Sequence, residues 1–118
     1  MTDTSPDRVL GLLGMATRAG AVVPGTERVR EAARAETLRL AVLATDASEN
    51  SRGKLLPLLT ARGISHVIRY ERSELGAAVG RGPLSAVGVV DSALASRLLT
   101  LMGDSSRGVP ASDRPGTG

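Results

Sequence analysis

The sequence of 118 residues contains no cysteine, no phenylalanine and no tryptophan, and its only aromatic residue is Tyr70. Without cysteine, the chain can form neither a disulfide scaffold nor a thiolate metal site, which fits a reducing compartment. The single histidine, His66, argues against a histidine zinc site and against a Ser-His-Asp triad. Leu, Val, Ile and Ala must therefore fill the interior, and this composition suits a parallel or mixed sheet packed under helices.

Long hydrophobic runs are also missing. No apolar stretch approaches the ~20 residues that a membrane helix needs, and no charged segment followed by an apolar one opens the chain. We therefore expect a soluble cytoplasmic protein that contacts no membrane. The length fits one domain, which we place at residues 5–102. Residues 1–4 and the Gly-, Ser- and Pro-rich residues 103–118 are expected to be disordered.

Acidic residues are slightly fewer than basic ones, and the formal net charge is +3. Arginine supplies fourteen of the fifteen basic residues, and Lys54 is the exception. This mild positive balance is compatible with a nucleic-acid partner but does not demonstrate one. Arginine-rich usage can equally reflect a GC-rich genome.

The clearest structural signal is the unbroken apolar run at residues 40–44, followed at once by the polar residues 45–50. An apolar run that does not alternate is typical of a strand covered on both faces. The polar residues after it favour a turn and a helix start. The sequence therefore predicts a βα unit whose strand lies in the middle of a sheet.

The remaining pattern alternates helices with short strands. Helices are predicted at residues 6–18, 26–36, 55–61, 73–80 and 92–102, and strands at residues 21–23, 40–44, 66–70 and 86–90. Ser5, Thr26 and Ser73 are the expected N-caps, and Pro57 either starts or kinks the third helix. This order predicts an α/β fold, a three-layer αβα sandwich.

Catalytic motifs are poorly represented. A phosphate-binding GxxxxGK[ST] loop fails at Ser48 and Leu55, and the glycines at 76, 80 and 82 do not match GxGxxG, so they are better explained as helix terminators. His66 has no acidic neighbour at metal-ligand spacing, and Asp46 is more typical of a turn or cap than of an acid–base pair with Glu49. The sequence predicts a protein that is not an enzyme and that uses no metal, cofactor or small-molecule substrate.

A better candidate site is the glycine turn at Gly25 that opens the second helix, together with Arg18. Such a turn presents free backbone N–H groups and the positive end of the helix dipole, where phosphate oxygens bind. Arg28 and Thr26 can add hydrogen bonds to the bases or backbone of a nucleic acid. An amphipathic helix with a solvated charged face explains the same spacing equally well.

Three short motifs occur in the order seen in one family: RAGAVVPG at residues 18–25, ATDAS at residues 44–48 and LGAAVG at residues 75–80. With the segments between them, they make residues 8–102 resemble the ribosomal protein L7Ae/L30e family of kink-turn RNA-binding proteins, and in particular its bacterial YlxQ-like branch. The resemblance implies an αβα sandwich with a mixed four-stranded sheet.

The resemblance also implies an RNA-binding surface made of two segments. The first comprises Gly25, Thr26, Glu27 and Arg28, and the second comprises Arg81, Pro83, Leu84 and Ser85. Two such loops suit RNA, which proteins read by shape and at splayed bases. In this chain Glu27, Arg28 and Glu31 replace the Asn, Glu and Lys of the strongest kink-turn binders, and Ala21 and Ala77 stand where the YlxQ-like branch often carries Lys.

We therefore expect non-catalytic binding of a structured RNA that is kink-turn-like or bulged and that belongs to the ribosome. An alternative is a protein–protein interaction module on the same fold, which would bind through the apolar loop around Leu84. A small enzyme or nucleotide-binding subunit using the Asp46 turn is a third alternative. The RNA prediction requires the two segments to lie on the same side of the molecule, with Arg18, Arg28 and Arg81 in one positive patch.

Overall fold

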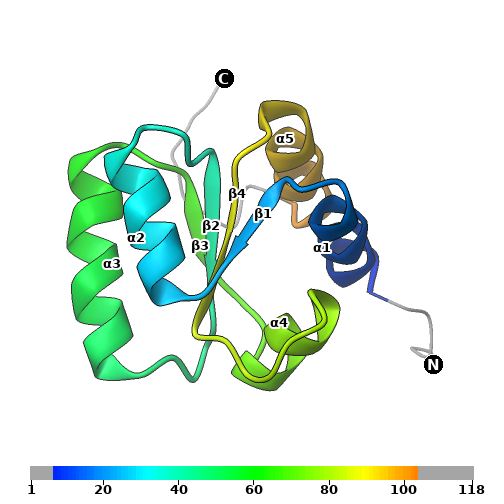
Figure 1. Cartoon of the computed structure of the whole chain (residues 1–118), viewed down its shortest axis with the longest axis horizontal. Helices are drawn as coiled ribbons and strands as arrows, with labels where there is room; N and C mark the ends of the chain where they lie inside the picture. The colour runs from blue at the N-terminus through cyan, green and yellow to red at the C-terminus, as the bar shows by residue number, and fades with distance from the viewer. Residues whose placement is uncertain (1–6, 104–118) are drawn as a thin grey trace.

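The computed structural model describes residues 7–103, so the predictions for residues 1–4 and for residues 104–118 lie outside the described part of the chain. The elements alternate along the chain as the sequence predicts (Figure 1). They are α1 (Arg8–Arg18), β1 (Val22–Pro24), α2 (Thr26–Arg34), β2 (Leu40–Leu43), α3 (Glu49–Ala61), β3 (His66–Ile68), α4 (Arg72–Ala78), β4 (Ala86–Val89) and α5 (Ser92–Leu101).

The four strands form one mixed sheet in the order β1-β4-β2-β3. β2 is parallel to β3 and antiparallel to β4, and β1 is antiparallel to β4. Every residue of β2 is buried, as is every residue of β4. The structure thus confirms the mixed sheet and the interior position of the strand that follows the second helix.

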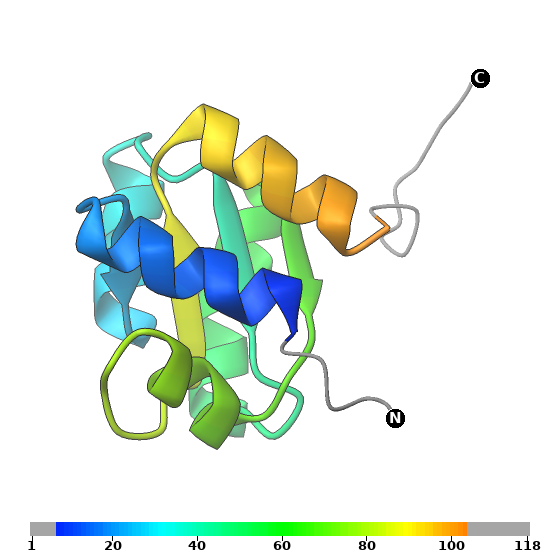
Figure 2. The ribbon, with the colours of Figure 1, turned by 90° about the vertical axis from the view of Figure 1, so that its right-hand side faces the viewer.

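Helices cover both faces of the sheet, which confirms the three-layer αβα sandwich. α2 and α3 lie on one face, and α1, α4 and α5 lie on the other (Figures 1 and 2). Leu55 and Leu59 of α3 belong to the core cluster on the first face, and Leu13 and Leu75 belong to the cluster on the second. Aliphatic side chains fill both clusters, apart from the buried Met102 and the partly buried Tyr70 at the margin.

The strand directions divide the connections between two ends of the sheet, which we name lower and upper as drawn in Figure 1. β1, β2 and β3 finish at the lower end and β4 begins there. The lower end therefore carries the β1–α2 turn, the β2–α3 loop and the α4–β4 loop. The α2–β2 and α3–β3 connections lie at the upper end (Figure 1).

Four helix starts differ from the prediction. The N-cap of α1 is Asp7 and not Ser5, because the Asp7 carboxylate accepts hydrogen bonds from the Val9 and Leu10 amides. The N-cap of α2 is Gly25, with φ 96°, and Thr26 is already helical. α3 begins at Glu49 rather than near Leu56, because the Ser48 hydroxyl accepts a hydrogen bond from the Ser51 amide at 3.1 Å. The apolar pattern indicates the start too late, since α3 opens with the exposed polar residues Glu49 and Asn50.

The start of α4 also differs, because the helix begins at Arg72 after Glu71, and the predicted cap Ser73 lies inside it. The Glu71 amide donates to the Glu74 carboxylate at 2.9 Å. Asp46 of the β2–α3 loop accepts a hydrogen bond from the Arg72 amide at 2.8 Å. A residue distant in sequence thus satisfies one of the first free amides of this helix.

Candidate nucleic-acid interface

The two segments predicted to bind RNA lie side by side at the lower end of the sheet. The Gly25 amide donates to the Ala86 carbonyl at 2.8 Å, one residue after the second segment. A Cβ built on Gly25 would lie 3.9 Å from the Leu84 Cδ2 atom. The two segments are therefore not on opposite sides of the molecule, and one ligand can reach both.

The β1–α2 turn, residues 25–28, leaves the first amides of α2 uncapped. Gly25 adopts a φ of 96°, in the left-handed region that favours glycine, and has no side chain to accept hydrogen bonds from the following amides. The Val29 amide is the first of the helix to reach a backbone carbonyl, that of Gly25, at 3.0 Å. The turn therefore offers amide donors and the positive end of the helix dipole at one place.

Side chains of α3 hold this turn from one side. The Thr26 and Ser51 hydroxyls are 2.9 Å apart, and the Lys54 Nζ atom lies 2.7 Å from a Glu27 carboxylate oxygen. Arg30 donates to the other Glu27 oxygen at 3.2 Å. The hydrogen bond from Lys54 is the main reason that the pKa of Glu27 is lowered.

Sequence reasoning missed Ser51 and Lys54 as parts of this site. The predicted third helix began after both residues, so no sequence pattern indicated that their side chains contact the second helix. The available signals were Ser48 followed by Glu49, a typical helix start, and the presence of the chain's only lysine three residues after Ser51.

The α4–β4 loop, residues 79–85, is held mainly by backbone contacts. The Leu84 amide donates to the Arg72 carbonyl at 3.1 Å, and the Ser85 carbonyl accepts from the Ala44 amide at 2.8 Å. The loop folds back over α4 at the buried Gly76, where a Cβ would collide with the Gly82 carbonyl. Gly76 therefore does not terminate the helix, in contrast to the prediction.

Leu84 is less available than the prediction of an apolar tip assumed. Its side chain is half-buried and packs against the core cluster under α1, α4 and α5. Pro83, beside it, is exposed. The apolar part of this surface is therefore small and continuous with the interior.

The arginines of the site differ in position. Arg28 and Arg81 are exposed, and within residues 7–103 neither guanidinium has a hydrogen bond or ion pair to another residue. Arg18 precedes β1, whereas Gly25 follows it, so the length of that strand separates them. Gly14, one turn before Arg18, packs against α4, where a Cβ would be 2.9 Å from the Ala78 carbonyl oxygen. Within residues 7–103 no hydrogen bond or ion pair joins the Arg18 side chain to the β1–α2 turn, so its place in one positive patch with Arg28 and Arg81 stays a prediction.

The polar residues of the β2–α3 loop serve to connect elements. Asp46 accepts from the Arg72 amide and lies 3.4 Å from its Nε atom, and the amide hydrogen bond is the main cause of its lowered pKa. Arg52 donates to the Thr45 carbonyl at 2.6 Å.

His66, the single histidine, hydrogen-bonds with the Ile64 carbonyl through Nδ1 at 2.8 Å, as a structural histidine does. Within residues 7–103, no group of three His, Cys, Asp or Glu side chains could hold a metal ion.

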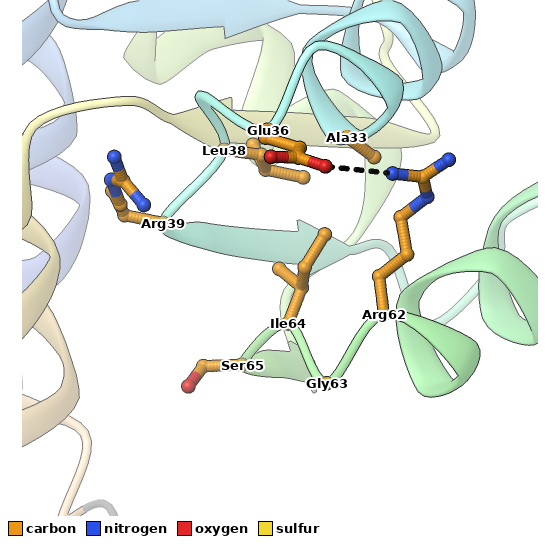
Figure 3. A pocket seen from close by; sticks show the side chains of 8 residues that line it. All are labelled: Ala33, Glu36, Leu38, Arg39, Arg62, Gly63, Ile64 and Ser65. Atoms are coloured by element: carbon orange, nitrogen blue, oxygen red, sulfur yellow. Dashed lines mark ion pairs between the residues drawn. The ribbon is translucent and has the colours of Figure 1, made fainter.

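A separate hollow of about 540 Å³ opens at the upper end of the sheet, away from Asp46 (Figure 3). It is lined by Ala33, Glu36, Leu38, Arg39, Arg62, Gly63, Ile64 and Ser65. Its charged rim includes a long ion pair between Arg62 and Glu36, at 3.8 Å.

In the part of the chain that the structure describes, no helix is both long and apolar enough to cross a membrane.

The sequence matches a family model over residues 7–99, that of the Ribosomal protein L7Ae/L30e/S12e/Gadd45 family. The chain belongs to this family. The match covers every element except the end of α5, so both segments of the site fall within it.

Two relatives align with this chain over most of their length. The chain is 31% identical over 91 residues to the RNA-binding protein YlxQ of Bacillus subtilis, covering 77% of this chain and 91% of that protein. It is 26% identical over 102 residues to the RNA-binding protein YlxQ of Enterococcus faecium, covering 86% and 98%. These relatives confirm the bacterial YlxQ-like branch.

Solved structures show the same fold. A protein of unknown function from Bacillus halodurans superposes with a TM-score of 0.78 at 30% identity, over 83% of this chain and 99% of that one. The 15.5 kD RNA-binding protein of Giardia lamblia superposes with a TM-score of 0.69 at 18% identity, over 85% and 89%. The second similarity, at this identity, concerns the fold alone.

Proposed function

We propose that this protein binds structured RNA without catalysing a reaction, through the β1–α2 turn and the α4–β4 loop. The observation that carries the proposal is the direct approach of Leu84 to Gly25, which joins two segments distant in sequence into one surface. The family and the RNA-binding relatives support RNA as the partner and support a protein that is not an enzyme. The cytoplasm is the compartment in which we expect it to act.

The surface provides the three kinds of contact that a folded RNA needs. The uncapped amides of α2 and its dipole attract a phosphate. Arg28 and Arg81 are exposed cations on the two segments, so they can contact the backbone on either side of that phosphate or the edges of bases. Leu84 and Pro83 offer an apolar surface on which an unstacked base can pack.

The finer part of the proposal is the kind of RNA. A helix terminus beside an apolar loop fits a bend at which the backbone turns sharply and a base leaves the stack, as in a kink-turn or a bulge of ribosomal RNA. Glu31, exposed one turn after Glu27, opposes a phosphate at that position. We therefore expect an affinity for a standard kink-turn below that of a surface with lysine at this position.

The protein–protein alternative is less well supported by the geometry. It depends on an exposed apolar patch around Leu84, and this side chain is half-buried and packed on the core. Exposed apolar patches smaller than a few hundred Å² are ordinary on monomeric proteins. The salt dependence of binding distinguishes this alternative from RNA binding, because binding through an apolar patch would depend little on salt.

A titration with RNA tests the proposal. The protein is titrated with a kink-turn RNA and with a plain duplex of equal length at two salt concentrations, and we expect tighter binding to the bent RNA that weakens steeply with salt. Arg28→Ala should weaken binding roughly five- to tenfold, since it removes one phosphate-contacting cation. Arg97→Ala, which removes a cation from the exposed side of α5, is the matched control and should leave affinity unchanged. Equal and negligible binding to both RNAs would overturn the proposal.

A further inference from the structure

The proposed phosphate site contains a carboxylate that should oppose its function. Glu27 is the second residue of α2, and 59% of its side chain is exposed. An acidic side chain in the first turn interacts favourably with the helix dipole, and so it competes with a phosphate for the same partial charge. It also repels the phosphate directly. RNA binding at this turn therefore requires that the Glu27 charge be neutralised or turned away.

Lys54 supplies that neutralisation from another element. Its ammonium group lies 2.7 Å from one Glu27 oxygen, while Arg30 lies 3.2 Å from the other. Arg30 belongs to the same helix as Glu27, so this ion pair does not connect the Glu27 carboxylate to another element. Lys54 belongs to α3, and its ion pair draws the carboxylate toward that helix.

A second contact between α2 and α3 lies beside the Glu27–Lys54 pair. Ser51 lies three residues before Lys54 on α3, and therefore on the same side of that helix. Ser51 is buried, and its hydroxyl lies 2.9 Å from the hydroxyl of Thr26, the residue before Glu27. Two neighbouring residues of α2 are thus matched by two neighbouring side chains of α3, which defines on which side of α2 the Glu27 carboxylate is held.

We infer that Lys54 is a positioning residue for RNA binding: it holds the Glu27 carboxylate against α3 and leaves the first amides of α2 and the Arg28 side chain to the RNA. This inference rests on the proposed function. It assigns to Lys54 an effect through Glu27 and no phosphate contact of its own. The effect of losing Lys54 should therefore disappear when Glu27 carries no charge.

A double-mutant cycle tests this dependence. We expect Lys54→Gln to weaken binding of a kink-turn RNA roughly fivefold, the effect of one uncompensated charge near a phosphate in water. Glu27→Gln should bind more tightly than the wild type, because it removes the carboxylate that competes with the phosphate. The double variant should bind like Glu27→Gln alone, so that removing the carboxylate rescues the loss of the lysine. An equal loss from Lys54→Gln in both backgrounds would overturn the inference, because it would indicate a direct contact between Lys54 and RNA.

Arg62→Gln is the matched control. Arg62 also pairs with an exposed glutamate, Glu36, at 3.8 Å, but at the upper end of the sheet. The substitution changes the net charge by the same amount and should leave RNA affinity unchanged. A loss equal to that of Lys54→Gln would show that net charge alone explains the result and would overturn the inference.

A measurement on the free protein separates this inference from the proposed function. NMR titration of the Glu27 carboxyl group should show that its pKa rises when Lys54 is replaced by Gln, because the pair no longer stabilises the ionised form. An unchanged Glu27 pKa would overturn the inference even if the wild type binds RNA. The Glu27 pKa could rise as expected in Lys54→Gln while the wild type binds no RNA. That result would overturn the proposed function and with it the role of Lys54 in binding.

Discussion

The two segments of the proposed site are held in place by different means. The β1–α2 turn is fixed by side-chain pairs, Thr26 with Ser51 and Glu27 with Lys54. The α4–β4 loop is fixed by backbone hydrogen bonds and by its close approach to α4 at Gly76. Side-chain pairs at a surface tolerate the loss of one partner, whereas a backbone packed on a glycine tolerates no added atom. Substitutions should therefore affect the two segments to very different degrees.

The largest effect is expected from Gly76→Ala. The new methyl group would collide with the Gly82 carbonyl, so the α4–β4 loop must move. Overpacking of this kind usually destabilises a protein by about 1–3 kcal/mol. We expect a loss of that size in the free energy of unfolding, measured by urea denaturation. The affinity for RNA should fall more than tenfold, because Leu84 leaves its position beside Gly25 and the loop that carries Arg81 is displaced.

Gly53→Ala is the matched control for this substitution. Gly53 is also helical, but it is exposed on α3, and a Cβ there would meet no atom within 4 Å. Alanine should stabilise the helix by up to about 1 kcal/mol and leave RNA binding unchanged. Wild-type affinity in Gly76→Ala would contradict the role assigned to the loop.

An intermediate effect is expected from Ser51→Ala, which acts on the other segment. The substitution removes the hydroxyl partner of Thr26, and the loss of one partly buried hydrogen bond costs about 1 kcal/mol. RNA affinity should fall only two- to threefold, an effect on the order of 0.5 kcal/mol, because the Glu27–Lys54 pair remains. Ser65→Ala, at the exposed upper end, is the control. A tenfold loss in Ser51→Ala would contradict the expected difference between the two segments.

The smallest effect concerns the connection that leads into α4. The Tyr70 hydroxyl donates to the Asp7 carboxylate at 2.9 Å, and burial followed by this hydrogen bond raises the Tyr70 pKa to about 12. A raised tyrosine pKa means that the folded state favours the neutral form. This stabilisation is complete below the ordinary pKa of 10 and is lost as the pH rises through about 12.

Tyrosinate absorbance reports on Tyr70 alone, since the chain has no other aromatic residue. We expect the folded protein to titrate near pH 12, and Asp7→Asn to move the midpoint part of the way back toward 10. RNA affinity at neutral pH should not change, because this contact lies outside both segments. A midpoint near 10 in the wild type would contradict the burial and hydrogen bonding of the phenol.

Local patterns in the sequence were sufficient for the architecture. The apolar run at residues 40–44 predicted the interior strand, because a strand covered on both faces needs no polar positions. The alternation of helices and strands predicted the layers. The helix starts were less predictable, since Gly25 occupies the N-cap position of α2 with a positive φ, and the Arg72 amide at the start of α4 donates a hydrogen bond to the distant Asp46.

The candidate site was only partly accessible from the sequence. The family resemblance indicated the two segments, and the structure confirms that Gly25 and Leu84 lie together, although their contact with RNA stays a prediction. The supporting residues Ser51 and Lys54 could not be found, because their partners lie about 25 residues away on another helix. The part of Arg18 in this surface also stays a prediction, because β1 lies between Arg18 and Gly25 in the chain.

The most direct test of the central claim is to map amide chemical-shift changes by NMR while a kink-turn RNA is added. The account predicts that residues 25–28 and residues 83–85 shift together and saturate at the same RNA concentration. Residues 62–65 around the hollow at the upper end should not respond. Shifts confined to the upper end, or two segments that respond at different concentrations, would contradict a single RNA-binding surface at the lower end.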